Sequence, residues 1–155
     1  MNGAYQQLGY VTNDFERAID LFRKLHELGP FKEMRELTIG ARAGQSVTAH
    51  FALAFKDATQ FEIIQPLDGD CTFYSDVLPD TAFAVRFHHL GHYYPKMKAF
   101  QGAKARCADR WPNPVDVTIF DGTYAYFNAR EDLGHYLELF SFPPATHFEG
   151  VPRYG

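Results

Sequence analysis

The sequence contains few of the features that mark membrane proteins, secreted proteins or cysteine-based metal proteins. Its two cysteines, Cys71 and Cys107, show no CxxC spacing and no histidine at metal-ligand spacing. We therefore expect free thiols in a reducing compartment rather than disulfides or a zinc–cysteine site. No stretch approaches the roughly 20 apolar residues that cross a bilayer, and the segment Met1 to Tyr10 lacks the charged and then apolar pattern of a leader. The expected location is the cytoplasm, without a membrane partner.

Clustered positive charge is also missing. The chain has 15 Lys and Arg against 19 Asp and Glu, a net charge of −4, and no basic run that could neutralise phosphates. Nucleic acid is therefore excluded as an expected partner. The chain is 155 residues long and has no long linker, so we expect a single domain over 1–155 with one sizeable core. Aromatic residues are plentiful by contrast, at 16%, which suits a lined cavity or a β-rich core.

Two short phrases occur twice, and each copy carries one polar side chain that can bind a metal. Gln7-Leu8-Gly9-Tyr10 returns as His89-Leu90-Gly91-His92, and Phe61-Glu62-Ile63-Ile64 returns as Leu137-Glu138-Leu139-Phe140. The order is the same in both halves and the intervals are similar, which indicates a duplicated module. At a pseudo-symmetric junction between the halves, one Gln, one His and two Glu could hold a single divalent metal ion.

Each half has the pattern of a βαβββ module. The first module covers about residues 5–67, and its first strand, over 5–12, leads into an amphipathic helix over 14–28. Asn13 and Glu16 resemble a capping box at the start of this helix. Three further strands are expected over 31–39, 46–56 and 60–65.

The second module covers about residues 82–142, after a seam from Asp68 to Asp80, and an extended tail follows over 143–155. Its first strand is expected over 82–92. A short helix comes next and is expected to end at Gly102, because glycine is a poor helix former. The remaining strands are expected near 103–109, 115–120, 123–128 and 135–141.

Side-chain alternation places Glu62, His89 and Glu138 on strand faces that also carry apolar residues. A carboxylate between apolar neighbours is costly to bury unless a cation or hydrogen-bond donors balance its charge. A single glutamate in such a strand more often faces water, but two glutamates at equivalent points of a duplication favour a shared cation. His88 and His92 fall on the opposite face from His89 and could join it only through a β-bulge. The histidines without a repeated partner are interpreted as structural or exposed: His50, His88, His92, His135 and His147.

On these motifs the chain resembles the vicinal oxygen chelate superfamily, which includes glyoxalase I, methylmalonyl-CoA epimerase, extradiol dioxygenases and bleomycin-resistance proteins. The resemblance covers about residues 5–142. It implies an α+β fold in which two βαβββ modules form an open, curled-sheet cup. By motif, the metal-ligand positions fall on Gln7, Glu62, His89 and Glu138. Gln7 stands where many members carry histidine, so we expect metal binding that is weaker than with an imidazole there.

The resemblance and the ligand chemistry together imply a glyoxalase-like, metal-dependent lyase, isomerase or epimerase. Two carboxylates, one amide and one imidazole suit a single Zn, Ni, Co or Mn ion. Dioxygenase chemistry is disfavoured, because non-haem iron oxygenases use two histidines and one carboxylate. The expected reaction removes a proton next to a carbonyl of a small-molecule substrate and passes through an enediolate-like intermediate on the metal. Glu138 is the first candidate for the base and Glu62 is the second.

The residues expected to line the substrate pocket lie two positions from a ligand on the same strand face: Gln60, Phe87, Tyr136 and Phe140. No basic cluster that would hold glutathione or coenzyme A is visible. The resemblance also implies a homodimer. Two alternatives stay open. One is a metal-free protein that sequesters a hydrophobic or aromatic small molecule in the same cup, as bleomycin-resistance members do, and the other is a structural remnant with a filled cup.

Overall fold

The computed structural model describes residues 6–41, 44–80, 82–143 and 149–155. The expected module start at residue 5 and the tail segment 144–148 therefore lie outside the described residues. In the first half the elements are β1 (Gln6–Thr12), α1 (Phe15–His26), β2 (Lys32–Ala41), β3 (Gln45–Lys56) and β4 (Thr59–Gly69). In the second half they are β5 (Val85–Tyr93), α3 (Met97–Arg110), β6 (Val115–Ile119), β7 (Gly122–Phe127) and β8 (Tyr136–Ser141). Three short elements were not expected: α2 (Thr72–Ser75), α4 (Arg130–Leu133) and β9 (Arg153–Tyr154).

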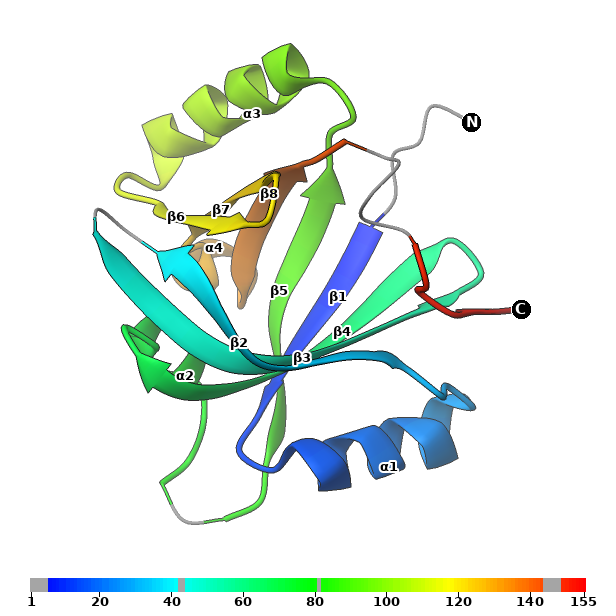
Figure 1. The fold of residues 1–155 in the computed structure, drawn as a ribbon. Coiled ribbons are helices and arrows are strands. Elements are labelled where there is room, and N and C mark those ends of the chain that lie inside the picture. Colours follow the sequence, from blue (N-terminus) through cyan, green and yellow to red (C-terminus); the bar gives the residue numbers. More distant parts are fainter. Residues whose placement is uncertain (1–5, 42–43, 81, 144–148) are drawn as a thin grey trace.

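The strands form one strongly curled sheet whose halves repeat the same internal order. β4 is a parallel neighbour of β1, β8 is a parallel neighbour of β5, and an antiparallel β1–β5 pair joins the halves. At the far ends, β2 contacts β6 through the pairs Gly40–Thr118 and Ala41–Val117, so the sheet closes on itself (Figure 1). The expected α+β fold with two curled βαβββ modules is confirmed.

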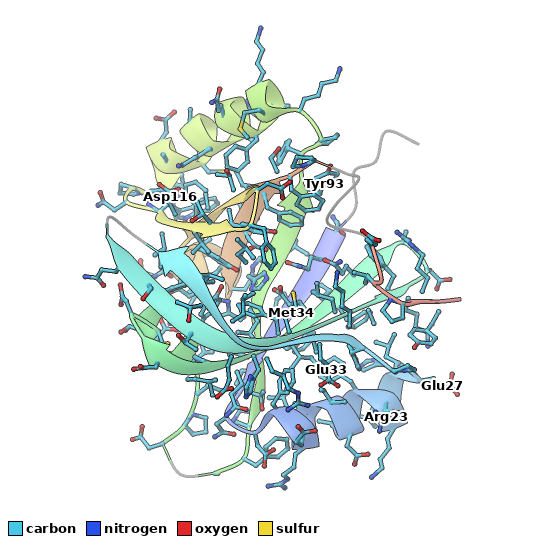
Figure 2. All side chains as sticks on the ribbon, in the orientation of Figure 1. Arg23, Glu27, Glu33, Met34, Tyr93 and Asp116 are labelled. Carbon is cyan, nitrogen blue, oxygen red and sulfur yellow. The ribbon has the colours of Figure 1, made fainter. Side chains whose placement is uncertain are left out.

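Both long helices lie outside the curled sheet (Figure 1). α1 buries one face against Phe61 and Ile63 on the outer side of the sheet, while α3 packs against Phe127 and Leu139 on that side. The inward-facing side chains form a separate, aromatic-rich cluster that occupies much of the space inside the curl (Figure 2). No helix among the described residues is long and apolar enough to cross a membrane.

Helix α1 begins with a different cap from the one expected. Asp14 is the N-cap, and its carboxylate accepts a hydrogen bond from the backbone N–H of Arg17. Asn13 instead accepts a hydrogen bond from the N–H of Ala84. The prediction of a capping box formed by Asn13 and Glu16 is therefore wrong, because Asn13 joins the β1–α1 turn to the segment before β5.

Helix α3 is longer than expected and replaces a predicted strand. It runs over Met97–Arg110, so the prediction of a strand near 103–109 is wrong. A glycine in a helix costs only about 0.5–1 kcal/mol relative to alanine. The buried side chains of Phe100 and Ala103 pack in the cluster between α3 and the sheet, and this burial outweighs the cost of Gly102. Local propensity alone overestimated the effect of one glycine.

A β-bulge in β5 changes which side chains face inward. Gly9 is paired with His89, but the next residue of β1, Tyr10, is paired with Phe87, so His88 is the extra residue. His88 and His89 are consequently both buried. Phe87 turns to the outer face, packs against Tyr10 and is 38% exposed. The strict alternation expected from sequence, with Phe87 and His89 on one face, is wrong at this point.

Part of the segment between the modules packs into the core. α2 carries Phe73 and Tyr74, and both side chains are buried in the inner cluster. The hydroxyl of Tyr74 shares a 3.0 Å hydrogen bond with the hydroxyl of Tyr126 on β7. The linker therefore packs inside the curl, next to the buried polar residues of β5 and β7.

The imidazole of His89 lies directly over Gly9, and this contact requires glycine. A Cβ at position 9 would lie 1.9 Å from Cε1 and 2.1 Å from Nε2 of His89. We expect Gly9→Ala to lower the free energy of unfolding by about 1–3 kcal/mol, because either the ring or strand β1 must shift. Chemical denaturation measures this change.

Gly102→Ala is the matched control for that substitution. The nearest atom to a Cβ at position 102 is Nη1 of Arg106, 3.5 Å away, and removing a glycine from a helix should add about 0.5–1 kcal/mol of stability. If Gly9→Ala is as stable as the native protein, the close approach of the ring to β1 is contradicted.

Candidate metal centre

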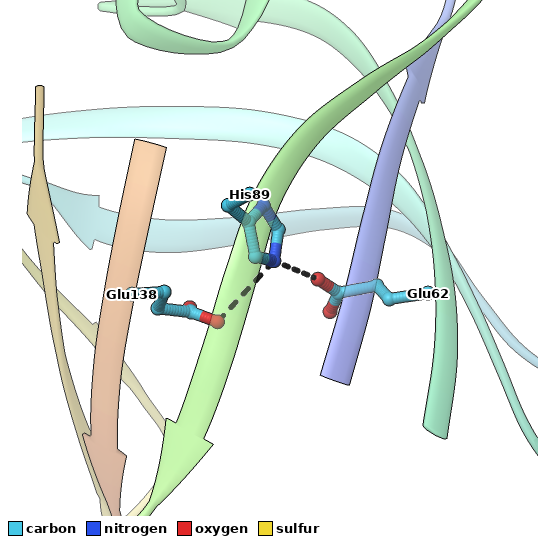
Figure 3. A group of neighbouring side chains, drawn as sticks. All are labelled: Glu62, His89 and Glu138. Atoms are coloured by element: carbon cyan, nitrogen blue, oxygen red, sulfur yellow. Dashed lines mark ion pairs between the residues drawn. The ribbon is translucent and has the colours of Figure 1, made fainter. Parts of the chain in front are cut away.

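Four polar side chains from four neighbouring strands meet on the inner side of the sheet. Nε2 of His89 on β5 lies 3.3 Å from Oε2 of Glu62 on β4 and 3.3 Å from Oε2 of Glu138 on β8. Oε1 of Gln7 on β1 lies 3.1 Å from the same nitrogen. Figure 3 shows the two carboxylates approaching the imidazole from opposite sides. All four residues are buried, so the structure brings together the set expected from sequence.

The strand register produces this convergence around two glycines. Gly9 is paired with His89 on one side and with Glu62 on the other. In the same way, Gly91 is paired with Gln7 on β1 and with Glu138 on β8. A Cβ at Gly91 would lie 3.0 Å from Oε1 of Gln7. Each repeated phrase therefore supplies both a polar side chain and the glycine that leaves room for its counterpart.

A hydrogen bond fixes the orientation of the Gln7 amide. Nε2 of Gln7 donates to Oε1 of Gln60 over 2.8 Å. Because the amide nitrogen is engaged on that side, the amide oxygen faces Nε2 of His89. Gln60, which was expected to line the pocket, instead lies one hydrogen bond behind Gln7 and is almost completely buried.

The cluster has unused hydrogen-bonding capacity. Among the described residues, three buried side-chain atoms lack a hydrogen-bond partner, and all three belong here: Nε2 of Gln60, Oε2 of Glu62 and Oε2 of Glu138. Buried polar atoms are normally paired, and unpaired carboxylate oxygens are costly. The ligand atoms of Glu62, His89 and Glu138 lie within 4.8 Å of one another, a separation that one cation can bridge. The donor set therefore fits a divalent metal ion.

The charges of the cluster are strongly coupled. Burial lowers the pKa of His89, but the adjacent Glu138 and Glu62 outweigh burial and raise it to about 9. Burial also raises the pKa of Glu62, an effect that His89 partly opposes. The carboxylates thus favour a positive charge at Nε2 of His89, where a proton and a metal ion compete for the same lone pair.

His88 sets the tautomer of His89. Nε2 of His88 lies 2.6 Å from the carbonyl oxygen of Phe73, which can only accept, so this nitrogen carries the hydrogen. Burial, together with the charge of His89, lowers the pKa of His88 to about 3, which keeps it neutral. Its Nδ1 is therefore an acceptor, 3.0 Å from Nδ1 of His89. His89 must donate from Nδ1, which leaves Nε2 as the nitrogen that faces the carboxylates.

The remaining predictions for the pocket lining have different outcomes. Phe140 lines the cleft beside the cluster. Tyr136 faces inward but stacks on His88, with ring centroids 4.6 Å apart, and its hydroxyl donates to Asp76. The prediction for Phe87 is wrong, because the β5 bulge turns its ring to the outer face.

Sequence reasoning missed two residues next to the cluster. His88 was interpreted as structural or exposed because it has no repeated partner, and only the bulge moves it inward. Tyr126 lines the cleft and packs edge-to-face on His89, with ring centroids 5.3 Å apart. Tyr126 shares the inner face of β7 with Tyr124. The alternation of side chains along this strand was therefore the only sequence signal that Tyr126 faces the cluster.

A cleft adjoins the cluster. Gln7, Glu62 and Glu138 form its polar part. The rest of the lining is mostly apolar and includes Met34, Leu37, Phe51, Leu53, Ile119, Phe120 and Phe140. The two carboxylates thus lie at the buried polar part of a cleft whose other walls are mostly apolar.

Comparisons with known proteins give a family and a set of similar folds. Residues 6–127 match the family described as the Glyoxalase/Bleomycin resistance protein/Dioxygenase superfamily. Glu138 lies beyond the matched residues, so its place in the cluster rests on the structure. A comparison with curated proteins gives no match.

Several solved structures share the fold at low sequence identity. A hypothetical protein from Bacillus halodurans C-125 aligns with a TM-score of 0.56 at 14% identity, over 90% of this chain and 94% of that one. Methylmalonyl-CoA epimerase from Mycobacterium tuberculosis aligns with a TM-score of 0.56 at 12% identity, over 92% and 89%. A Streptomyces coelicolor methylmalonyl-CoA epimerase variant in complex with 2-nitronate-propionyl-CoA gives 0.56 at 13% identity, over 93% and 97%. At these identities the likeness concerns the fold.

The hydrogen-bond chain through His88 predicts a loss of metal affinity when it is broken. We expect His88→Phe to weaken Zn²⁺ binding roughly 10–100-fold, because His89 loses the acceptor that orients it. His88→Gln should recover part of the affinity, since its amide oxygen can accept from His89 while its nitrogen donates to Phe73. Competition titration with a chromophoric chelator measures the affinity.

His92→Phe is the matched control, because His92 lies on the other side of the same strand and is not part of this hydrogen-bond chain. Native affinity in a folded His88→Phe protein would contradict the proposed role of His88.

Proposed function

The chain belongs to the glyoxalase/bleomycin resistance protein/dioxygenase superfamily, and from this membership and the buried polar cluster we propose that it is a metal-dependent isomerase, epimerase or lyase. The reaction is the removal of a proton next to a carbonyl group of a small molecule. The observation that carries the proposal is the convergence of the Glu62 and Glu138 carboxylates on Nε2 of His89 at the wall of a cleft, with each Oε2 atom 3.3 Å from that nitrogen.

Four residues would hold the ion: Gln7, Glu62, His89 and Glu138. Two carboxylates balance the charge of a divalent cation, and Zn, Ni, Co and Mn all suit a site with one nitrogen and several oxygen ligands. When bound, such an ion supplies Lewis-acid stabilisation for an oxygen atom next to the carbon that loses its proton. The hydrogen bond from Gln7 to Gln60 and the chain through His88 support the proposal, because both orient a ligand atom inward.

The base is a glutamate of the same cluster. Glu138 is our first candidate and Glu62 the second, since both carboxylates reach the cleft where a substrate would lie. Either carboxylate can accept a proton from a substrate that lies in the cleft. Apolar walls around the carboxylates exclude water and strengthen their interaction with a substrate.

The substrates named for the structural neighbours are starting points for assays. One neighbour is methylmalonyl-CoA epimerase in complex with methylmalonyl-CoA and NH4⁺. Because Lys32 is the one cation among the described lining residues of the cleft, simple 2-hydroxy ketones without phosphate groups come first in a proton-exchange assay, and methylmalonyl-CoA serves as the comparison. The cytoplasmic location and the homodimer stay predictions from the sequence, and sedimentation analysis of the purified chain tests the second.

Glutamine substitutions separate metal binding from proton removal. We expect Glu138→Gln and Glu62→Gln to retain a bound metal ion, because an amide oxygen already serves at position 7 in the proposed site. An amide cannot accept the substrate proton, so the variant that removes the base should lose roughly 100-fold or more of the exchange of that proton with deuterated water. NMR measures the exchange, and elemental analysis measures the metal content.

Glu131→Gln, on the exposed helix α4, controls for a change of charge and should leave exchange unchanged. If both cluster variants exchange protons at the native rate, neither glutamate is the base and the proposal fails.

A second function is favoured by the apolar walls of the cleft. A metal-free protein with this cleft would sequester an apolar small molecule, as expected for a bleomycin-resistance-like role. Stoichiometric divalent metal in protein purified without chelators supports the enzyme. Tight binding of apolar ligands by a protein that takes up no added Zn²⁺, Ni²⁺, Co²⁺ or Mn²⁺ supports sequestration.

A further inference from the structure

We propose that the cleft selects a substrate whose body, away from the end that faces the polar cluster, is apolar and preferably aromatic and carries no further negative charge. Phe120 is the residue that selects the aromatic body. This inference deepens the proposed function and rests on it, because the oxygen atoms of the substrate are the end that faces the polar cluster.

The cleft has two kinds of wall, which match two ends of a substrate. Its polar part consists of Gln7, Glu62 and Glu138. The opposing walls come from β2 and β3 on one side and from the β6–β7 hairpin on the other. Their apolar lining residues are Met34, Leu37, Phe51, Leu53, Ile119 and Phe120. A molecule that fills the cleft must therefore present oxygen atoms at one end and apolar surface along the rest.

A local irregularity in β2 adds to the apolar wall. The register of β2 against β3 shifts between Met34 and Leu37, and Glu36 has a positive φ of 49°. Regular alternation would place residues an odd number of positions apart on opposite faces. The irregularity lets both Met34 and Leu37 line the cleft, and Figure 2 shows Met34 near the middle of the molecule. The strand is thus bent in a way that gives the cleft a second apolar side chain.

Phe120 breaks two local rules at the mouth of this cleft. It is the first residue of the two-residue turn between Ile119 and Gly122, and its φ is 52°. A positive φ at this turn position is normally taken by glycine, and a bulky side chain there is strained. The side chain is also 77% exposed although it is fully apolar. Phe120 is thus both strained and exposed, and it lines the cleft. Contact with a ligand explains why such a residue is present at this position.

The charge of the cleft limits what else the substrate carries. Among the described lining residues, Lys32 is the one cation, and its ammonium group already donates to the carbonyl oxygen of Glu149 over 2.6 Å. A polyanionic group such as a diphosphate would face two carboxylates and a single lysine. Apolar contacts, rather than several ion pairs, therefore supply the binding energy for the part of the substrate that lies away from the cluster.

Three 2-hydroxy acids with the same chelating head test this substrate class. Mandelate carries a phenyl group, lactate carries a methyl group, and malate carries a second carboxylate. For the Zn²⁺-loaded full chain, isothermal titration should show mandelate binding roughly tenfold or more tightly than lactate, because the phenyl ring buries more apolar surface. Malate should bind no more tightly than lactate. A mandelate-to-lactate ratio near one, or malate as the tightest ligand, would overturn the proposal.

Two substitutions at position 120 separate contact with the ligand from a structural role. Phe120→Gly relieves the positive φ and should raise the melting temperature by about 2–4 °C, while the mandelate-to-lactate ratio falls at least threefold. Phe120→Ala should lower the ratio to the same extent without that gain in stability. Leu25→Ala is the control, because Leu25 is equally apolar and 68% exposed but lies on α1, outside the cleft. An unchanged ratio in both position-120 variants assigns Phe120 a structural role only.

The failure of this inference and the failure of the proposed function give different results. If Zn²⁺ binds and mandelate shows no advantage, the substrate class is wrong and the metal-dependent function stands. If Zn²⁺ does not bind, the proposed function fails, but the preference for a phenyl group can still be measured with the metal-free protein.

Discussion

Two carboxylates buried beside one imidazole nitrogen are the constraint on which the rest of the structure depends. Glu62 and Glu138 each place an oxygen 3.3 Å from Nε2 of His89, in a part of the core that is almost inaccessible to water. Charges in such a place need compensation from a proton or a metal ion. The surrounding structure keeps the three groups together. The sheet register brings their strands side by side, two glycines leave room for the side chains, and the hydrogen bond to His88 orients the His89 ring.

The same arrangement explains why the sheet is irregular where it is. The bulge in β5 places two histidines on the inner side, so that one can contact the carboxylates while the other holds its tautomer. The shift in β2 turns two apolar side chains toward the cleft. Regular strands of the same length would present fewer inward groups. Bulges of this kind are common beside functional sites because they redirect a side chain without breaking the sheet.

Much of the fold and the core of the candidate site could be predicted, because the repeated phrases carry local and long-range information together. Gln7 and His89 occupy equivalent places in two similar strands, as do Glu62 and Glu138, and pseudo-symmetry then implies that all four meet. The errors came from places where one contact overrides a local rule. Gly102 did not end α3 because packing on the sheet outweighs its poor propensity. Asn13 did not cap α1 because it accepts a hydrogen bond from Ala84.

The sequence by itself determined the class of fold, the duplication and the residue types that can bind a metal, since these depend on composition, periodicity and repeated spacing. Only the tertiary structure decided which histidine supports His89, which aromatic rings reach the cleft, and where Phe87 points. The physical reason is that β1 and β5 are far apart in the chain, and the bulge in their pairing moves every following side chain to the other face. Nothing local in either strand specifies that shift.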